Sequence, residues 1–164
     1  MKTLYLLRHA KSDWNSDYSA DHNRPISKRG IRAATNIGKY AFENKIRPDI
    51  IMCSSSRRTR ETIALVSENA QWSDIKINFE DSLYLARTET ALGVIRAAPQ
   101  SIDSLLLVGH QPWTGAVASR LLGGKTIDVP TACFIGIQLD LDDWSFAGSN
   151  PGKLVMHVLP RSLD

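Results

Sequence analysis

Cysteine is scarce in this chain, with Cys53 and Cys133 the only two among 164 residues. Two cysteines cannot form the disulfide framework that supports small secreted domains. Each lies within an apolar run, so we predict two reduced thiols buried in a core. Long hydrophobic runs are also absent, because charged or polar residues interrupt every apolar stretch well before the roughly 20 residues that a membrane-spanning helix needs.

Two further absences narrow the class of protein. The first apolar run, residues 4–7, is too short for the hydrophobic region of a signal peptide, and no small-residue cleavage site follows it. We therefore expect a cytoplasmic location. The chain also has no internal repeats, low-complexity stretches or Pro/Ser-rich linkers. Its length suits one domain over residues 1–164.

The charge balance is slightly basic, with 20 Lys and Arg residues, 17 Asp and Glu residues, and a pI near 9.0. Basic residues are spread along the chain except for a cluster over residues 57–60. No aromatic residues are interleaved with this cluster, and no zinc-finger or RNA-binding signature is present. A modest positive charge suits an anionic ligand, so we expect no nucleic acid and no membrane among the partners.

Hydrophobic patterning predicts alternating strands and helices. Five segments have the apolar, partly β-branched character of strands: residues 3–7, 49–53, 104–108, 133–139 and 154–159. Residues 140–152, rich in Asp, Gly, Ser, Asn and Pro, read as a surface loop. This order favours a three-layer α/β/α sandwich with a mostly parallel sheet.

Four helices are predicted between the strands. Ser27 is the expected N-cap of a helix over residues 30–42, and a second helix should start near Ser56. A third spans residues 89–97, and Pro112 suits the first turn of a fourth that reaches residue 122. The residues expected to face inward are Ile31, Ala34, Ile37 and Ala41 in the first helix and Thr62, Leu65 and Val66 in the second.

Basic and imidazole side chains follow three of the predicted strands. The first strand ends in Arg8 and His9, the second leads into Arg58, and the strand over residues 104–108 ends just before His110. In open α/β sheets, ligands bind at the carboxyl ends of the strands. Two histidines and at least two arginines should therefore meet at one edge of the sheet.

Four segments in this order resemble the histidine phosphatase superfamily, which has the phosphoglycerate-mutase-like fold. The segments are LLRHAKSDWN (6–15), RPISKRG (24–30), SSSRRTRET (54–62) and VGHQP (108–112). The short chain, the Arg-His-Ala start and the RPISKRG run are most similar to the phosphohistidine phosphatases of the SixA type. The chain has no room for the long insertions of larger phosphoglycerate mutases.

The resemblance implies a nucleophile at His9, with Arg8, Arg58 and His110 around the transferred phosphoryl group. A phosphoryl group in transfer spreads negative charge over three oxygens, and paired arginine donors match that geometry. Ser12 and Asn15 could add neutral hydrogen bonds. No cofactor and no metal is expected, because no His/Cys/Asp/Glu cluster has ligand spacing and the arginines supply positive charge.

Physical chemistry adds three expectations about the site. His9 must be neutral to attack, and neighbouring arginines should lower its pKa. A carbonyl or hydroxyl bonded to the other ring nitrogen would fix its tautomer. The amides at the start of the helices that follow Ser54 and include Pro112 should add partial positive charge.

The acidic proton donor common in mutases is not clearly identifiable in the sequence. Glu80 and Asp81 are the nearest candidates, and strand alternation would let only one of them face the pocket. We take Glu80 as the candidate catalytic acid, although the sequence fits an ordinary surface carboxylate about equally well.

Several chemistry-bearing residues are expected to have ordinary structural roles. His22 and His157 are read as surface residues, and Arg57 and Arg60 as a solvated helix face. Core or rim packing explains Trp14 and Trp113 as well as substrate stacking does, and Lys11 is either solvent-exposed or attracts anions.

The sequence therefore predicts a phosphatase acting through a phosphohistidine intermediate, on a phosphorylated protein or a small phosphorylated substrate. Phosphohistidine in proteins is the favoured substrate. The alternatives are a phosphatase or mutase of small phosphomonoesters, and a phosphate-binding interaction module without turnover.

Overall fold

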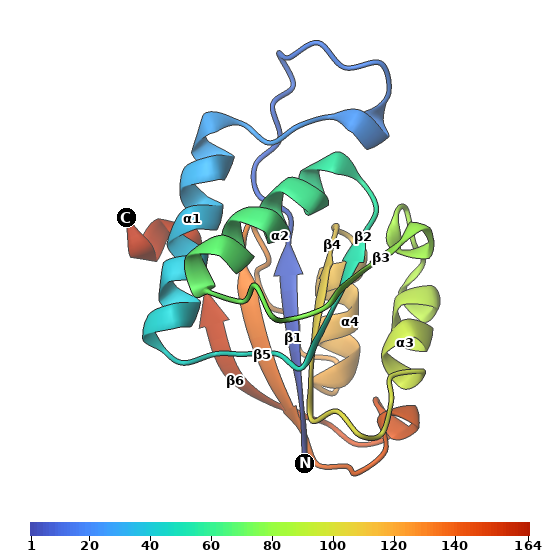
Figure 1. The fold of residues 1–164 in the computed structure, drawn as a ribbon. Helices are drawn as coiled ribbons and strands as arrows, with labels where there is room; N and C mark the ends of the chain where they lie inside the picture. Colours follow the sequence, from blue (N-terminus) through green and yellow to red (C-terminus); the bar gives the residue numbers. More distant parts are fainter.

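A six-stranded mixed sheet forms the centre of the computed structural model, which describes residues 1–164 (Figure 1). The strands are β1 (Lys2–Arg8), β2 (Ile50–Ser54), β3 (Ile77–Glu80), β4 (Ser104–Gly109), β5 (Phe134–Leu139) and β6 (Lys153–Val158). Their order across the sheet is β3-β2-β4-β1-β5-β6. Strands β1 to β4 are mutually parallel, β5 pairs antiparallel with β1, and β6 at the edge pairs antiparallel with β5.

Two pairs of helices cover the two faces of the sheet. Helices α1 (Lys28–Glu43) and α2 (Arg57–Ala70) pack together on one face, and α3 (Thr88–Arg96) and α4 (Trp113–Leu121) lie against the other (Figure 1). Each face has its own apolar core, because alternate residues of the buried strands point to opposite sides. The predicted three-layer α/β/α sandwich is confirmed.

Capping residues fix where α1 and α2 begin. The Ser27 hydroxyl accepts a hydrogen bond from the Gly30 amide at 3.1 Å, as expected, and Ser56 caps α2 in the same way through Thr59. The predicted inner position of Ile31 is wrong, since its side chain is 45% exposed. Ile31 lies beside the buried stripe of α1, not within it. The residues of that stripe are Gly30, Ala34, Ile37, Gly38 and Ala41.

Two other parts of the fold differ from the sequence prediction. Strand β3 was not expected, because this edge strand has only four residues, none fully buried. The predicted surface loop over 140–152 contains a 3-10 turn, Trp144–Phe146, whose Trp144 is fully buried and donates to the Ile102 carbonyl at 3.0 Å. Short edge strands and isolated buried aromatics carry little periodic signal.

The parallel strands deliver their carboxyl ends to a common edge. Arg8 pairs in register with Gly109, while Cys53 pairs with Val108, so the residues that follow β1, β2 and β4 meet there. The long connection from β1 to α1 arches over this edge (Figure 1). None of the helices combines the length and apolar character needed to cross a membrane.

Candidate active site

His9 lies directly after β1, held by its backbone on both sides. Its amide donates to the Gly109 carbonyl at 2.9 Å, and its own carbonyl accepts from the Ala132 amide at 2.9 Å. The residue is 8% exposed. The nucleophile candidate is therefore fixed between the end of β4 and the turn that precedes β5.

The tautomer of His9 follows from one hydrogen bond. Its Nδ1 lies 2.7 Å from the Ala10 carbonyl oxygen, which can only accept, so Nδ1 carries the proton and Nε2 keeps its lone pair. Burial, together with the charges of Arg58, Arg8 and Arg24, lowers the pKa of His9 to about 4, against an opposing effect of the Ala10 bond. The imidazole is neutral near pH 7 and able to act as a nucleophile.

Thr62 anchors the residue that holds His9. Its hydroxyl accepts a hydrogen bond from the Ala10 amide at 2.9 Å and donates to the Arg58 carbonyl at 2.7 Å. Thr62 is fully buried in α2. It was predicted as an inward-facing residue, and the structure adds that it connects the segment after His9, the candidate nucleophile, to the helix carrying Arg58.

His110 faces His9 across the site, with 5.4 Å between the ring centroids. Its Nε2 is 2.8 Å from the Ser54 hydroxyl, while its buried Nδ1 has no partner. Burial and the charges of His9 and Arg58 lower the pKa of His110 to about 3, so this ring is also neutral near pH 7. If the Ser54 hydroxyl donates to Nε2, Nδ1 carries the proton and can donate to an oxyanion.

Two buried arginines, Arg24 and Arg58, and the half-buried Arg8 lie around the two histidines. Arg8 donates from Nη1 to the Val129 carbonyl at 3.0 Å. Arg58 donates from Nη1 to the backbone carbonyl of Asp21 at 3.0 Å, and Arg24 forms an ion pair with the Asp21 carboxylate. The charges of all three act on His9. Arg24 was present in one of the quoted motifs, but its role in the site was not predicted.

Asp21 is the carboxylate that the structure brings into this cluster. It accepts from Arg58 Nη2 at 3.2 Å and from the Tyr84 hydroxyl at 2.5 Å. Burial alone would raise its pKa, but the Tyr84 bond and the Arg58 and Arg24 charges together lower it to about 2. Asp21 is therefore ionised near pH 7 and does not supply a proton.

His22, predicted to be an ordinary surface residue, also contacts the site. Although exposed, it places Nε2 3.0 Å from the Ser55 hydroxyl and packs edge-on against Tyr84, with the ring centroids 4.8 Å apart. Tyr84 in turn lies 5.7 Å from the His110 ring. No local sequence signal marked His22 or Tyr84, because the fold alone brings their segments to His110.

Unpartnered donors concentrate around His9. Six buried side-chain polar atoms lack a hydrogen-bond partner, and four belong to residues whose charge or ring acts on His9. A fifth is the hydroxyl of Ser12, three residues along the chain. These five atoms are Arg8 Nε, Ser12 Oγ, Arg24 Nε, Arg58 Nε and His110 Nδ1. Because buried polar groups are nearly always paired, this concentration fits a site built to bind an oxyanion.

The remaining predicted site residues are less closely involved. Ser12 is buried, whereas Asn15 is exposed, and only the Asn15 backbone makes a hydrogen bond, to Asp13. Trp14 is 67% exposed and lies over Arg24, with 3.6 Å between the guanidinium carbon and the ring centroid. Trp113 is a core residue that packs against Gly109, where any β-carbon would collide with the indole.

Glu80 lies at the end of β3, and its side chain makes no hydrogen bond or ion pair. This side chain lines a groove of about 460 Å³ between β2, β3 and α3, together with Asn78 of β3 and Lys76, the residue before the strand. Asp81 is exposed. The structure therefore gives neither carboxylate a contact with His9 or His110.

The sequence predicted that the first amides of α4 would face a bound phosphate, but the structure pairs two of them within the protein. Gln111 folds back so that its Oε1 accepts from the Gly115 amide at 2.7 Å, and the Thr114 amide donates to the His110 carbonyl. Pro112 is the N-cap, one position before the helix. Protein acceptors thus occupy amides that were expected to face phosphate.

The two outer arginines of α2 and the two cysteines lie where the sequence predicted. Arg57 and Arg60 are exposed on α2, as expected, and Arg57 pairs with Glu61 at 3.2 Å. Cys53 and Cys133 are buried free thiols, and burial raises the pKa of each to about 12. No group of three or more His, Cys, Asp or Glu side chains comes together in metal-binding proximity.

Comparison with known proteins agrees with the fold. Residues 4–84 match the family model of the histidine phosphatase superfamily, branch 1. An uncharacterized protein of Mycobacterium tuberculosis is 36% identical over 126 residues, covering 77% of this chain and 76% of the relative.

Solved structures extend the similarity over almost the whole chain. A protein of Agrobacterium tumefaciens, provisionally named phosphohistidine phosphatase SixA, has 28% identity and a TM-score of 0.83, covering 97% of this chain and 98% of its own. The protein histidine phosphatase SixA in complex with tungstate has 18% identity and a TM-score of 0.84, with 99% of both chains covered.

A neutral histidine after the first strand, among arginines and facing a second histidine, defines a site of the histidine phosphatase class. This chain belongs to the histidine phosphatase superfamily, in its SixA-type branch.

Proposed function

We propose that this protein hydrolyses the phosphorus–nitrogen bond of phosphohistidine in proteins, through a covalent intermediate on His9. The observation that carries the proposal is the concentration of unpartnered buried donors around a neutral His9 whose Nε2 lone pair is free. Such a site binds an oxyanion and also contains a nucleophile, which a pure binding module does not need.

In the first step, the Nε2 lone pair of His9 forms a bond to phosphorus as the bond to the substrate imidazole breaks. The electron pair of the broken bond stays on the substrate nitrogen, which leaves as neutral imidazole when its other nitrogen is protonated. Arg8, Arg58 and Arg24 offset the charge on the three equatorial oxygens, and His110 donates through Nδ1.

In the second step, water attacks the phosphorus of phosphorylated His9. The new phosphorus–oxygen bond replaces the bond to Nε2, whose electron pair returns to His9. The proton released from water passes to the phosphate oxygens, so inorganic phosphate leaves and the neutral His9 tautomer is restored. Nδ1 of His9 keeps its proton throughout and donates it to the Ala10 carbonyl, which keeps the ring in one orientation.

The lack of a proton donor supports phosphohistidine over alkyl phosphates. Asp21 is the carboxylate bonded to the site residues, and its pKa of about 2 leaves it ionised near pH 7. An alkoxide leaving group gains about 10²–10⁴-fold from general acid catalysis, whereas imidazole is a much weaker base and leaves with little help. The substrate class named in the SixA relative is consistent with this chemistry.

Turnover of a substrate panel tests the proposal. The panel contains a phosphohistidine protein, a phosphoserine peptide and small sugar phosphates, each measured as kcat/KM with the purified chain. The phosphohistidine protein should be preferred by a wide margin. Preference for a sugar phosphate would instead indicate a phosphatase of small phosphomonoesters.

Acid-free quenching of the reaction tests the intermediate. Radiolabelled phosphate should remain on the wild-type chain and map to His9. The His9→Ala variant should lose the label and at least about 10³-fold in kcat, as removal of a nucleophile generally does. His157→Ala, which changes an exposed histidine of β6, provides the matched control. Full activity in His9→Ala would contradict the covalent mechanism.

A further inference from the structure

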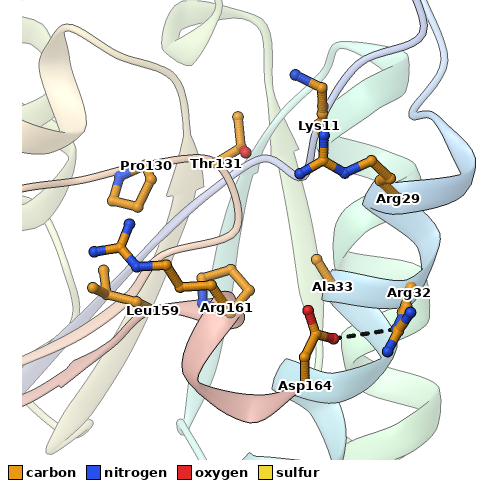
Figure 2. Close-up of a pocket in the computed structure, with 10 residues that line it drawn as sticks. Lys11, Arg29, Arg32, Ala33, Pro130, Thr131, Leu159, Arg161 and Asp164 are labelled. Carbon is orange, nitrogen blue, oxygen red and sulfur yellow. Dashed lines mark ion pairs between the residues drawn. The ribbon is translucent and has the colours of Figure 1, made fainter.

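A second hollow, of about 280 Å³, lies between α1, the turn before β5 and the C-terminal 3-10 turn Pro160–Leu163 (Figure 2). Four of its lining side chains are basic: Lys11, Arg29, Arg32 and Arg161. Asp164 is the one acidic side chain in the lining. We call these five residues and the space between them the basic pocket.

The basic pocket carries the formal net charge of the whole protein. The chain has 20 basic and 17 acidic residues, so outside the basic pocket 16 of each remain and their charges balance. Arg32 forms an ion pair with Asp164, with 3.1 Å between Nε and Oδ1. Lys11, Arg29 and Arg161 form no ion pair with any carboxylate.

The three unpaired cations come from three different elements. Lys11 belongs to the segment after β1, Arg29 to the first turn of α1, and Arg161 to the C-terminal 3-10 turn. Figure 2 shows Lys11 and Arg29 side by side on one wall, with Arg161 across the hollow near Pro130. Cations that are held near one another repel. An anion bound between them would attract all of them and so offset this repulsion.

We propose that the basic pocket binds a small anion that carries several phosphoryl charges. Arginine forks match phosphate oxygens in geometry, and lysine adds a compact positive charge. The hollow lies just below the usual size range of ligand sites, roughly 300–1,000 Å³, so it suits a short oligophosphate more than a large cofactor. If these basic side chains served only to contact solvent, they would have no need to line a hollow.

Both walls of the basic pocket are continuous with the segments that hold the nucleophile. Lys11 follows Ala10, whose carbonyl holds His9 Nδ1, and Thr131 precedes Ala132, whose amide holds the His9 carbonyl. The Lys11 carbonyl is fixed in turn by the Ser27 amide at 2.7 Å. An anion bound here would lie beside the backbone frame of His9 without using the catalytic donors.

NMR titration of the full chain with inorganic tripolyphosphate tests the proposal, because it reads the two sites separately. Amide shifts of Ala33 and Thr131 report on the basic pocket, and those of Gly109 and Ser55 report on the candidate active site. Both sets should move, with different midpoints. In the double variant Arg29→Gln/Arg161→Gln, the Ala33 and Thr131 curves should weaken at least about tenfold, as expected on losing two charge-assisted contacts.

The matched control is Lys39→Gln/Lys125→Gln, which removes two exposed cations that do not line the hollow. This variant should leave the Ala33 and Thr131 curves within about twofold of wild type, since distant exposed charges are screened. Equal weakening in both double variants would show a general charge effect and overturn the proposal. So would the absence of any Ala33 or Thr131 shift up to about 10 mM, the range of very weak binding. Binding is read without turnover, so a negative result leaves the proposed hydrolysis untouched.

Discussion

Asp21 and Arg58 form a two-point contact beside His110. The Arg58 guanidinium donates to the Asp21 backbone carbonyl at 3.0 Å and to the Asp21 carboxylate at 3.2 Å. The same carboxylate also pairs with Arg24 and accepts from Tyr84. Asp21, which lies in the β1–α1 connection, thus binds the same guanidinium groups that we assign to phosphate binding.

This relationship predicts that Asp21→Asn strengthens anion binding. The substitution keeps the shape and the backbone carbonyl contact but removes the negative charge that offsets Arg58 and Arg24. The inhibition constant of orthovanadate should fall about threefold to tenfold, in the range of a partly exposed charge interaction. Asp17→Asn, an exposed change in the same connection, is the control. Weaker inhibition in Asp21→Asn would show that the carboxylate mainly aligns Arg58.

Thr62→Val should lower kcat about tenfold while changing KM little, because a small displacement of a reacting group has a large effect on rate. Valine has a similar volume but cannot accept from the Ala10 amide, so the segment that holds His9 loses its anchor. Thr62→Ser should restore kcat because it keeps the hydroxyl. A fall in melting temperature with kcat unchanged in Thr62→Val would assign Thr62 a purely structural role.

The depressed histidine pKa values predict how stability depends on pH. His9 and His110 have pKa values of about 4 and 3 in the folded state, below the ordinary value of 6.5. The unfolded chain therefore binds more protons between about pH 6.5 and 3, so stability falls as pH falls through this window. For His9 alone, the loss is on the order of 3 kcal/mol.

Urea denaturation at pH 7.5 and pH 5 measures this effect. The double variant His9→Asn/His110→Asn should lose less stability than wild type between the two pH values, because neither asparagine titrates. His22→Asn/His157→Asn, at two exposed histidines, should behave as wild type. An unchanged acid response in the active-site double variant would mean that other groups control it.

Glu80→Gln and Asp81→Asn should barely slow the dephosphorylation of phosphohistidine, because neither side chain contacts His9 or His110. Any residual activity on alkyl phosphates should suffer more than activity on aryl phosphates, whose leaving groups are better. Single-turnover rates with each substrate measure this difference. A loss of several hundredfold on phosphohistidine in a folded variant would restore Glu80 or Asp81 as an essential acid.

Chelation should leave activity intact, because arginines offset the phosphoryl charge in the proposed mechanism. The measurement compares kcat/KM before and after exhaustive dialysis against EDTA. Loss of activity followed by recovery on adding Mg²⁺ or Zn²⁺ would contradict it.

The sequence by itself determined the class of fold and which strand-end residues meet at one edge of the sheet. Hydrophobic strands alternating with amphipathic helices specify a parallel core, and in such a core the residues that follow the strands meet at one edge. Arg8, His9 and His110 could therefore be expected at that edge from their positions, whereas Arg58 and the proposed roles of all four came from the motifs that resemble the family. The N-cap Ser27 was equally readable, because capping depends on local chemistry.

Only the tertiary structure decided which residues complete the site. Asp21 and Tyr84 are 63 positions apart, and their contact depends on how the β1–α1 connection folds over the sheet. In the same way, Lys11 and Arg161 line one hollow from opposite ends of the chain. Such contacts have no periodic or local signature, because long-range packing creates them, whereas the strand-end residues are positioned by the backbone pattern itself.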